Sequence, residues 1–163
     1  METNRYILSI LVDNEPGVLS RISGLFSGRG FNIDSLSVAK TADPHVSVVT
    51  MVTFCDAHVI EQIKKQLHKL INVITVNDLT QKAYVERELA LVKVHAKTDK
   101  RAEIMRIVDI FRSRIVDVGS SHFIVEVSGD SGKLNAFVEL MKPMGIIEIA
   151  STGTIALGRE TGK

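Results

Sequence analysis

The chain is short of the residues that cross-link a protein or anchor it in a membrane. Its 163 residues include one cysteine, Cys55, and no run of 18 apolar residues. A single cysteine excludes an internal disulfide, and Cys55, at the end of an apolar segment, is expected to be a small buried hydrophobe. No segment long enough for a membrane-spanning helix and no secretory leader is recognisable. We therefore expect a protein of the reducing cytoplasm, with no membrane partner.

An excess of charge of either sign is also missing. Lys and Arg total 20 against 19 Asp and Glu, a formal net charge of +1, and the charges are scattered along the chain. Because nucleic-acid-binding domains carry a basic patch, no nucleic-acid partner is expected. Aromatic residues make up only 5% of the chain. An RNA-recognition module needs two or three aromatics on its central strands, where this sequence offers Tyr6 and Phe54 among aliphatic residues.

No pattern of catalytic or metal-binding residues occurs. Gly28 and Gly30 lack the third glycine of a dinucleotide-binding loop, and they follow a predicted helix instead of beginning one. There is no G-x-S-x-G motif, and Cys55 has no neighbouring base to activate it as a nucleophile. The five histidines, which show neither an i,i+4 pair nor neighbouring ligands at metal spacing, are His45, His58, His68, His95 and His122. We therefore predict no catalytic residue, no metal site and no cofactor in this chain.

The sequence does contain a regular alternation of strand-like and helix-like segments. An apolar helical stripe starts at Val18 and ends before Gly28, and Asp56 is a suitable N-cap for a second helix. Strands are predicted at residues 6–12, 31–40, 46–54 and 73–79. The order βαββαβ within residues 1–79 is that of the ferredoxin-like fold.

The second half repeats this order. Residues 80–88 are polar and are predicted to be a linker; strands are predicted at 89–96, 115–118, 123–127 and 146–157, the last interrupted by Gly153. One helix is predicted around 104–111 and another after Ser131, which we take as its N-cap. The sequence therefore predicts an α+β protein with two tandem ferredoxin-like βαββαβ domains, at residues 1–79 and 89–163.

The first predicted sheet has more apolar surface than its two helices can cover. In a βαββαβ unit both helices cover one face of the sheet, so the other face needs polar residues or a partner. Segment 46–54 carries apolar residues on both faces, Val48 and Val52 against Val49 and Met51. An uncovered apolar face or a free edge strand favours self-association. The alternative is that the second copy folds back over the first.

The segment 13–19 (DNEPGVL) joins the first strand directly to the first helix. The first-turn N–H groups of such a helix have no intrahelical partners, and together with the helix dipole they suit a small anion such as an amino-acid carboxylate. Gly17 has no side chain to exclude that ligand. Asp13 and Glu15 disfavour phosphate, whereas Asn14 suits a zwitterion. An ordinary strand-to-helix turn, with Pro16 fixing φ, is the alternative interpretation.

The second copy lacks this turn. We align the two copies by matching Leu25-Phe26 with Ile110-Phe111, which gives a constant shift of 85 residues. At that shift Asn14 lies opposite Asp99, and residues 16–17 lie opposite residues 101–102. If one half of the chain binds a small ligand, we expect it to be the first.

Several longer segments identify a family. Residues 13–19 and 29–33 (RGFNI) resemble an ACT domain, a small amino-acid-sensing module. The likeness extends along nearly the whole chain to the small regulatory subunit of acetolactate synthase (acetohydroxyacid synthase). The segments that carry it are 21–33 (RISGLFSGRGFNI), 62–70 (QIKKQLHKL), 85–88 (VERE) before 91–93 (LVK), and 131–134 (SGKL).

The resemblance implies a non-catalytic subunit that activates a separate large subunit, which uses thiamine diphosphate, FAD and Mg, and that confers feedback inhibition by valine. It also implies that ACT domains pair into a homodimer with valine at their interface. The family's binding positions fall on Asn14, Gly17, Val18 and Asn32, with Ile33 and Ala39 as wall residues. The family often has serine where this chain has Pro16, which changes one backbone donor. A stand-alone amino-acid-sensing regulator of another enzyme or of a transcription factor is the alternative function.

Overall fold

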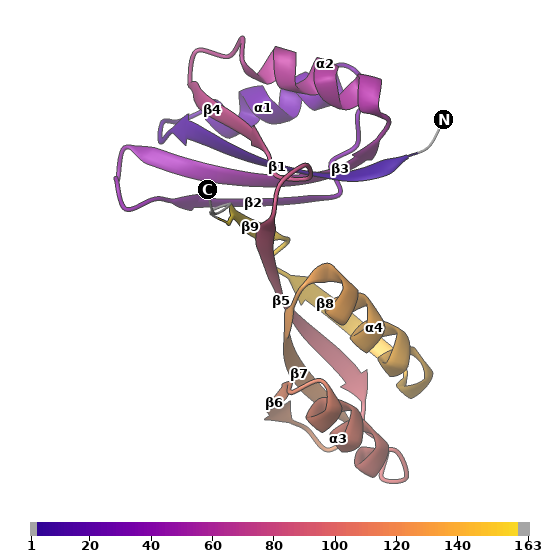
Figure 1. Ribbon diagram of the computed structural model, residues 1–163. Helices are drawn as coiled ribbons and strands as arrows, with labels where there is room; N and C mark the ends of the chain where they lie inside the picture. The colour runs from indigo at the N-terminus through magenta and orange to yellow at the C-terminus, as the bar shows by residue number, and fades with distance from the viewer. Residues whose placement is uncertain (1–2, 160–163) are drawn as a thin grey trace. The chain divides into compact units, whose positions relative to one another are not determined.

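A computed structural model describes residues 3–159 and divides the chain into two compact units (Figure 1). One unit comprises Met1–Val85 together with Thr154–Lys163, and the other comprises Glu86–Gly153. No helix among residues 3–159 combines the length and the apolar character needed to cross a membrane.

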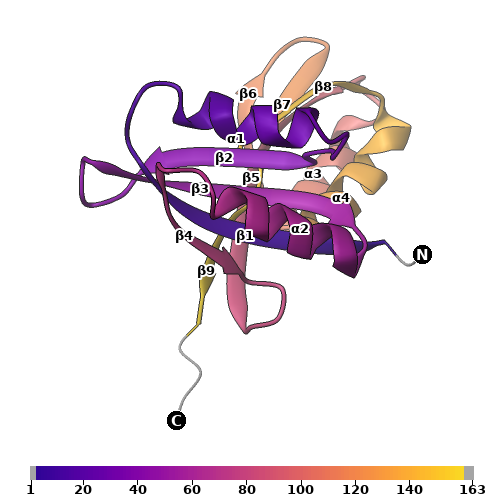
Figure 2. The same ribbon diagram turned by 90° about the horizontal axis from the view of Figure 1, so that it is seen from above.

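The first unit is a four-stranded antiparallel sheet with two helices on one face. The strand order is β2-β3-β1-β4, and Figure 2 shows α1 and α2 lying in front of the strands. The elements are β1 (Asn4–Asp13), α1 (Val18–Ser27), β2 (Ser35–Lys40), β3 (Val46–Cys55), α2 (Ala57–Leu67) and β4 (Val73–Asp78). Four of these elements, β1, α1, β3 and β4, lie within two residues of their predicted bounds, and α2 begins directly after its predicted cap, Asp56. The strand predicted from residue 31 begins only at Ser35.

The core of the first unit follows from the alternation of β1. Tyr6, Leu8, Ile10 and Val12 are buried beneath the helices, because successive side chains of a strand point to opposite faces. The apolar stripe of α1 packs on them, with its own buried residues Val18, Ile22 and Phe26. Burial of these side chains places the N-terminus of α1 at the end of β1, where the 13–17 turn lies.

The second unit repeats the arrangement, with strand order β6-β7-β5-β8. Its elements are β5 (Tyr84–His95), α3 (Arg101–Ile110), β6 (Arg114–Val118), β7 (His122–Gly129), α4 (Ser131–Met141), a 3-10 turn (Lys142–Met144) and β8 (Ile146–Ser151). A separate core joins this sheet to α3 and α4. The structure therefore confirms an α+β protein in which the βαββαβ pattern occurs twice.

The boundaries of the units differ from the predicted ones at two places. The segment 84–88, predicted to be linker, is the start of strand β5. The last predicted strand is two strands. The second of them, β9 (Ile155–Gly158), pairs with β5 and belongs, like the first two residues of β5, Tyr84 and Val85, to the first unit. Ala156 of β9 packs against Ile7, Val52 and Leu79, on the sheet face that α1 and α2 leave open (Figure 1). Sequence periodicity carries no information on such a long-range return of the chain.

The return of β9 also bears on the apolar face that the sequence leaves uncovered. Ile7 and Val52 are each 1% exposed, because Ala156 and Leu79 cover them. Among the described residues of the C-terminal half, Ala156 of β9 is the one that joins this apolar cluster. The opposite end of the same face carries Leu11, Val48 and Ala39, which are cross-strand neighbours.

Equivalent hydrogen bonds correct the alignment of the two copies. The Asn14 N–H donates to the His45 carbonyl over 2.8 Å, and the Ala96 N–H donates to the Ser121 carbonyl over 2.9 Å at the same point of the second unit. Asn14 thus corresponds to Ala96, a shift of 82 residues and not 85.

The backbone after each first helix gives the same shift. Gly30 has φ 68° and Arg112, 82 residues later, has φ 50°. At this shift Gly17 corresponds to Asp99. The second copy therefore has neither the asparagine nor the glycine of the first turn, and the inference that it lacks the open turn holds on the corrected alignment.

One predicted helix cap is wrong. Asp130, not Ser131, caps α4, and its carboxylate accepts the Lys133 N–H over 2.8 Å. The hydroxyl and N–H of Ser131 both donate to Glu86 Oε1. An aspartate one position earlier serves equally well as an N-cap, so the pattern alone does not choose between the two residues.

Candidate functional site

Gly17 forms the left-handed turn that begins α1, with φ 85° and ψ −7°. A Cβ placed on Gly17 would meet no heavy atom of residues 3–159 within 4 Å. No described side chain caps α1, whereas Asp56 and Asp130 cap α2 and α4. α3 is uncapped too, but Lys100 stands at its N-cap. The first turn of α1 thus has no side-chain acceptor and adjoins open space at Gly17.

Asn14 holds this turn against the β2–β3 hairpin. Its Nδ2 donates to the Pro44 carbonyl over 2.9 Å, and its Oδ1 accepts from the Ser47 hydroxyl over 3.2 Å. Its main-chain N–H also donates to His45, so backbone and side chain fix the residue together. Asn14 remains exposed, and its second amide hydrogen can still donate to a ligand.

The other predicted binding residues are placed differently. The side chain of Val18 is 5% exposed and belongs to the core, so this residue offers a ligand no aliphatic wall. It offers only its N–H, which makes a long hydrogen bond of 3.5 Å to the Glu15 carbonyl. Asn32 is exposed, and its carbonyl accepts from the Thr53 hydroxyl over 2.7 Å. Ile33 is partly buried against the first core. Ala39 is exposed on β2, on the sheet face away from the helices.

The structure brings together only part of this predicted set. Asn14, Gly17 and Val18 lie in one turn before α1, whereas Asn32 and Ile33 follow its C-terminal end. Because α1 has 10 residues, its two ends are about 15 Å apart. One amino acid cannot contact both groups within a single protomer.

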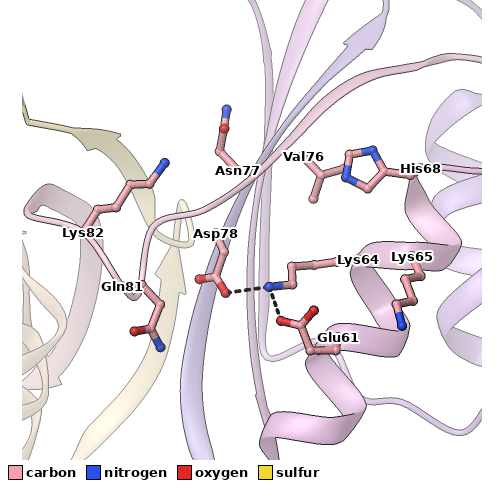
Figure 3. Close-up of a pocket in the computed structure, with 9 residues that line it drawn as sticks. All are labelled: Glu61, Lys64, Lys65, His68, Val76, Asn77, Asp78, Gln81 and Lys82. Atoms are coloured by element: carbon pink, nitrogen blue, oxygen red, sulfur yellow. Dashed lines mark hydrogen bonds and ion pairs between the residues drawn. The ribbon is translucent and has the colours of Figure 1, made fainter.

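A separate pocket of about 450 Å³ lies between α2 and β4 (Figure 3). Its lining is charged: the Lys64 ammonium pairs with the carboxylates of Glu61 and, at 3.4 Å, Asp78. The hydrogen bond to Glu61 has the largest effect and raises the pKa of Lys64. Burial opposes it, and the charge of Asp78 raises the pKa further. No local sequence pattern marks this pocket, since Lys64 and Asp78 belong to different elements. Its central cation is already neutralised by protein carboxylates.

The described residues offer little other reactive chemistry. Among residues 3–159, no three His, Cys, Asp or Glu side chains lie close enough together to hold a metal ion. Burial raises the pKa of the Cys55 thiol, and the negative charges of Asp56 and Asp78 raise it further. A raised pKa lowers the thiolate fraction, which is opposite to what a nucleophilic cysteine needs.

Comparison with known proteins assigns the chain to a family. A family model described as "Small subunit of acetolactate synthase" matches residues 87–160, and one described as "AHAS small subunit-like ACT domain" matches residues 8–75. The probable acetolactate synthase small subunit of Archaeoglobus fulgidus is 48% identical over 159 residues, covering 98% of this chain and 99% of that protein. The chain belongs to the acetolactate synthase small-subunit family.

Further members of the acetolactate synthase small-subunit family are similar over nearly their full length. The isozyme 3 small subunit of Escherichia coli is 49% identical over 156 residues, covering 95% of this chain and 96% of that protein. The crystal structure of the small subunit from Thermotoga maritima superposes with a TM-score of 0.86 at 39% identity, covering 98% and 99% of the two chains. These matches confirm the family and the ACT fold of the first unit that the sequence motifs indicate.

Proposed function

We propose that this chain is the regulatory subunit of an acetolactate synthase. It activates a separate large catalytic subunit and confers feedback inhibition by valine in branched-chain amino-acid biosynthesis. The single observation that carries the proposal, beyond family membership, is the uncapped first turn of α1 beside Gly17. Backbone N–H groups at a helix N-terminus attract a carboxylate, and an exposed glycine leaves room for it.

The catalytic chemistry belongs, on this proposal, to the large subunit. That subunit holds thiamine diphosphate, FAD and Mg, while this chain carries no cofactor and acts in the cytoplasm. Two of the described residues, Cys55 and Lys64, have displaced pKa values that are in keeping with the proposal. Cys55 is held as a neutral thiol and Lys64 as a paired cation, and neither is poised for proton transfer or nucleophilic attack.

The proposed valine site lies between two protomers whose ACT domains pair as a homodimer. Asn14, Gly17 and the N–H of Val18 of one protomer hold the amino-acid head group. Asn32, Ile33 and Ala39 complete the site from the partner. The support is that the two groups of one protomer are separated by the length of α1, about 15 Å, which is too far for one amino acid. In a homodimer the second group of the partner can lie beside the first group, so that one ligand contacts both.

Valine can inhibit only by binding two states of the complex with unequal affinity. We propose that it bridges two first units and stabilises the arrangement in which the large subunit is less active. The aliphatic part of the site discriminates weakly, since one methylene in an apolar pocket changes the binding free energy by about 1–3 kcal/mol. Leucine and isoleucine are therefore expected to act as weaker inhibitors.

Substitution of Gly17 by aspartate tests the site. Gly17→Asp places a carboxylate where the ligand carboxylate binds, so valine should no longer inhibit the reconstituted enzyme, while activation of the large subunit persists. Gly17→Asn is the matched control, because asparagine tolerates a positive φ equally well but carries no charge; it should retain part of the response to valine. Loss of activation by Gly17→Asp with inhibition intact would refute this location of the site.

A pull-down experiment distinguishes the proposed function from that of a stand-alone regulator. Tagged chain recovered from a cell extract should bring down a thiamine-diphosphate-dependent enzyme. Recovery of a transcription factor or of another enzyme in its place would favour the alternative function.

A further inference from the structure

Asn72, in the loop between α2 and β4, lies at the centre of a polar network behind the 13–17 turn. It is 8% exposed. Its Nδ2 group donates to the Asp13 carboxylate over 3.3 Å and to the Glu15 carboxylate over 3.2 Å, and its Oδ1 accepts from the Arg21 guanidinium. Its main-chain carbonyl also accepts the Asp13 N–H over 2.9 Å.

The network holds two carboxylates that lie close to the proposed anion site. Asp13 and Glu15 flank a helix N-terminus that is to receive an anion, and a free carboxylate there would compete for the N–H groups or repel the ligand. Asn72 draws both carboxylates to its own side of the turn, because one amide group donates to each. Hydrogen bonds to charged groups are among the stronger ones in proteins, so the two bonds together favour this orientation although each of them is long.

The second unit shows that the fold does not require this side chain. There the His95 N–H donates to the Gly145 carbonyl over 2.9 Å, just as the Asp13 N–H donates to Asn72. Both acceptors precede a strand that begins beside a β-bulge of the central strand. Gly145 therefore takes the place of Asn72 and has no side chain. The asparagine occurs in the unit whose turn is open and is missing from the unit whose turn is not.

We propose that Asn72 is a positioning residue for the effector site: it keeps the Asp13 and Glu15 carboxylates away from the first turn of α1. The inference rests on the proposed function, since it assigns Asn72 a role in holding the turn that receives valine. It reaches beyond the turn itself, because it makes ligand affinity depend on the loop between α2 and β4.

Two measurements on the full chain test this role. The first is amide hydrogen exchange in the free protein, with Asn72→Ala compared against Asn77→Ala, an exposed asparagine on the following strand. Asn72→Ala should accelerate exchange at Glu15, Gly17 and Val18 several-fold, and Asn77→Ala should leave it unchanged. Unchanged exchange in Asn72→Ala would overturn the proposal whether or not the protein binds valine.

The second measurement is calorimetric titration with L-valine, at a temperature well below the unfolding midpoint of every variant. Asn72→Ala should weaken binding about 10-fold, which corresponds to about 1.4 kcal/mol, while Asn77→Ala should bind like the unmodified chain. Adding Glu15→Ala to Asn72→Ala should restore part of the affinity, because the carboxylate no longer needs to be held. A purely structural role would lower the unfolding midpoint without changing the dissociation constant of the folded protein.

The outcomes keep the two proposals apart. If the unmodified chain binds no valine, the proposed function fails, and the exchange experiment still decides whether Asn72 orders the turn. If valine binds and Asn72→Ala binds it equally tightly, the positioning role is wrong and the proposed function stands.

Discussion

At the scale of single residues, the start of α1 depends on one glycine conformation. Gly17 has φ 85°, a value that costs an L-residue with a side chain about 1–2 kcal/mol. The sequence pointed to Gly17 because this glycine lies between Pro16 and an apolar helical stripe, a position that fits either a ligand site or an ordinary strand-to-helix turn. It did not indicate Asn72, because the contact between Asp13 and Asn72 joins positions 59 residues apart.

A pair of glycine substitutions distinguishes the effect of backbone conformation from the effect of the room available for a side chain. Gly17→Ala should lower the free energy of unfolding by about 1 kcal/mol through backbone strain, although a Cβ has room there. Gly24→Ala, in the middle of α1 and equally unobstructed, should raise it by about 0.5–1 kcal/mol, since alanine loses less entropy in a helix. Chemical denaturation of both variants checks the prediction. Equal effects of the same sign would contradict the left-handed assignment of Gly17.

The thiol of Cys55 should respond to pH in a defined direction. Burial and the nearby charges of Asp56 and Asp78 raise its pKa above the ordinary value of 9.0. The folded chain should therefore react with a thiol reagent at pH 8 more slowly than the unfolded chain, because less thiolate is present. Stability from this group is complete below pH 9.0 and is lost as the pH rises through the folded-state pKa. Faster reaction of the folded protein would show that the thiol is activated instead.

At the scale of elements, local signals decided most of what was predictable. Apolar alternation identified β1 and β3, and the helical stripe identified α1. Two errors have the same origin: residues 31–34 precede β2 instead of opening it, and Asp130 takes the cap expected of Ser131. In both cases neighbouring residues satisfy the same local preference, and only tertiary contacts choose between them.

The N-cap of α2 offers a test at this scale. The Asp56 carboxylate accepts the Val59 N–H over 2.9 Å. Asp56→Ala should lower the free energy of unfolding by about 1 kcal/mol, whereas Asp56→Asn, which can still accept this hydrogen bond, should change it little. Helix content and denaturation midpoints measure both variants. An equal loss in the two would mean that the charge of Asp56 matters and its capping bond does not.

At the scale of the whole chain, the two units are not consecutive halves. Residues of β9 complete the first unit, although β9 follows the second βαββαβ unit in the sequence. No local sequence pattern shows to which unit this strand belongs. Sequence reasoning found the repeat because hydrophobic periodicity is local, and it misplaced the boundary because the burial of Ala156 depends on Ile7 and Val52. The shift between the copies was also misjudged, since apolar stripes match at more than one register.

A buried charge introduced on β9 should destabilise the first unit. Ala156 is 5% exposed against Ile7, Val52 and Leu79, so Ala156→Asp buries an unpaired carboxylate and should destabilise that unit by several kcal/mol. Leu157→Asp is the control, because Leu157 is 76% exposed. Amide exchange should accelerate at Ile7 and Val52 in Ala156→Asp and stay unchanged at Val92 and Val125. Acceleration confined to Val92 and Val125 would place β9 with the second unit.

The central claim is that this chain regulates, and does not itself catalyse, acetolactate formation. The most direct measurement is the rate of acetolactate formation by an isolated large subunit, with and without this chain and with and without valine. The account predicts no product from this chain alone, a higher rate when it is added to the large subunit, and a fall in that rate with valine. Turnover by this chain alone, or a rate that neither the chain nor valine changes, would contradict it.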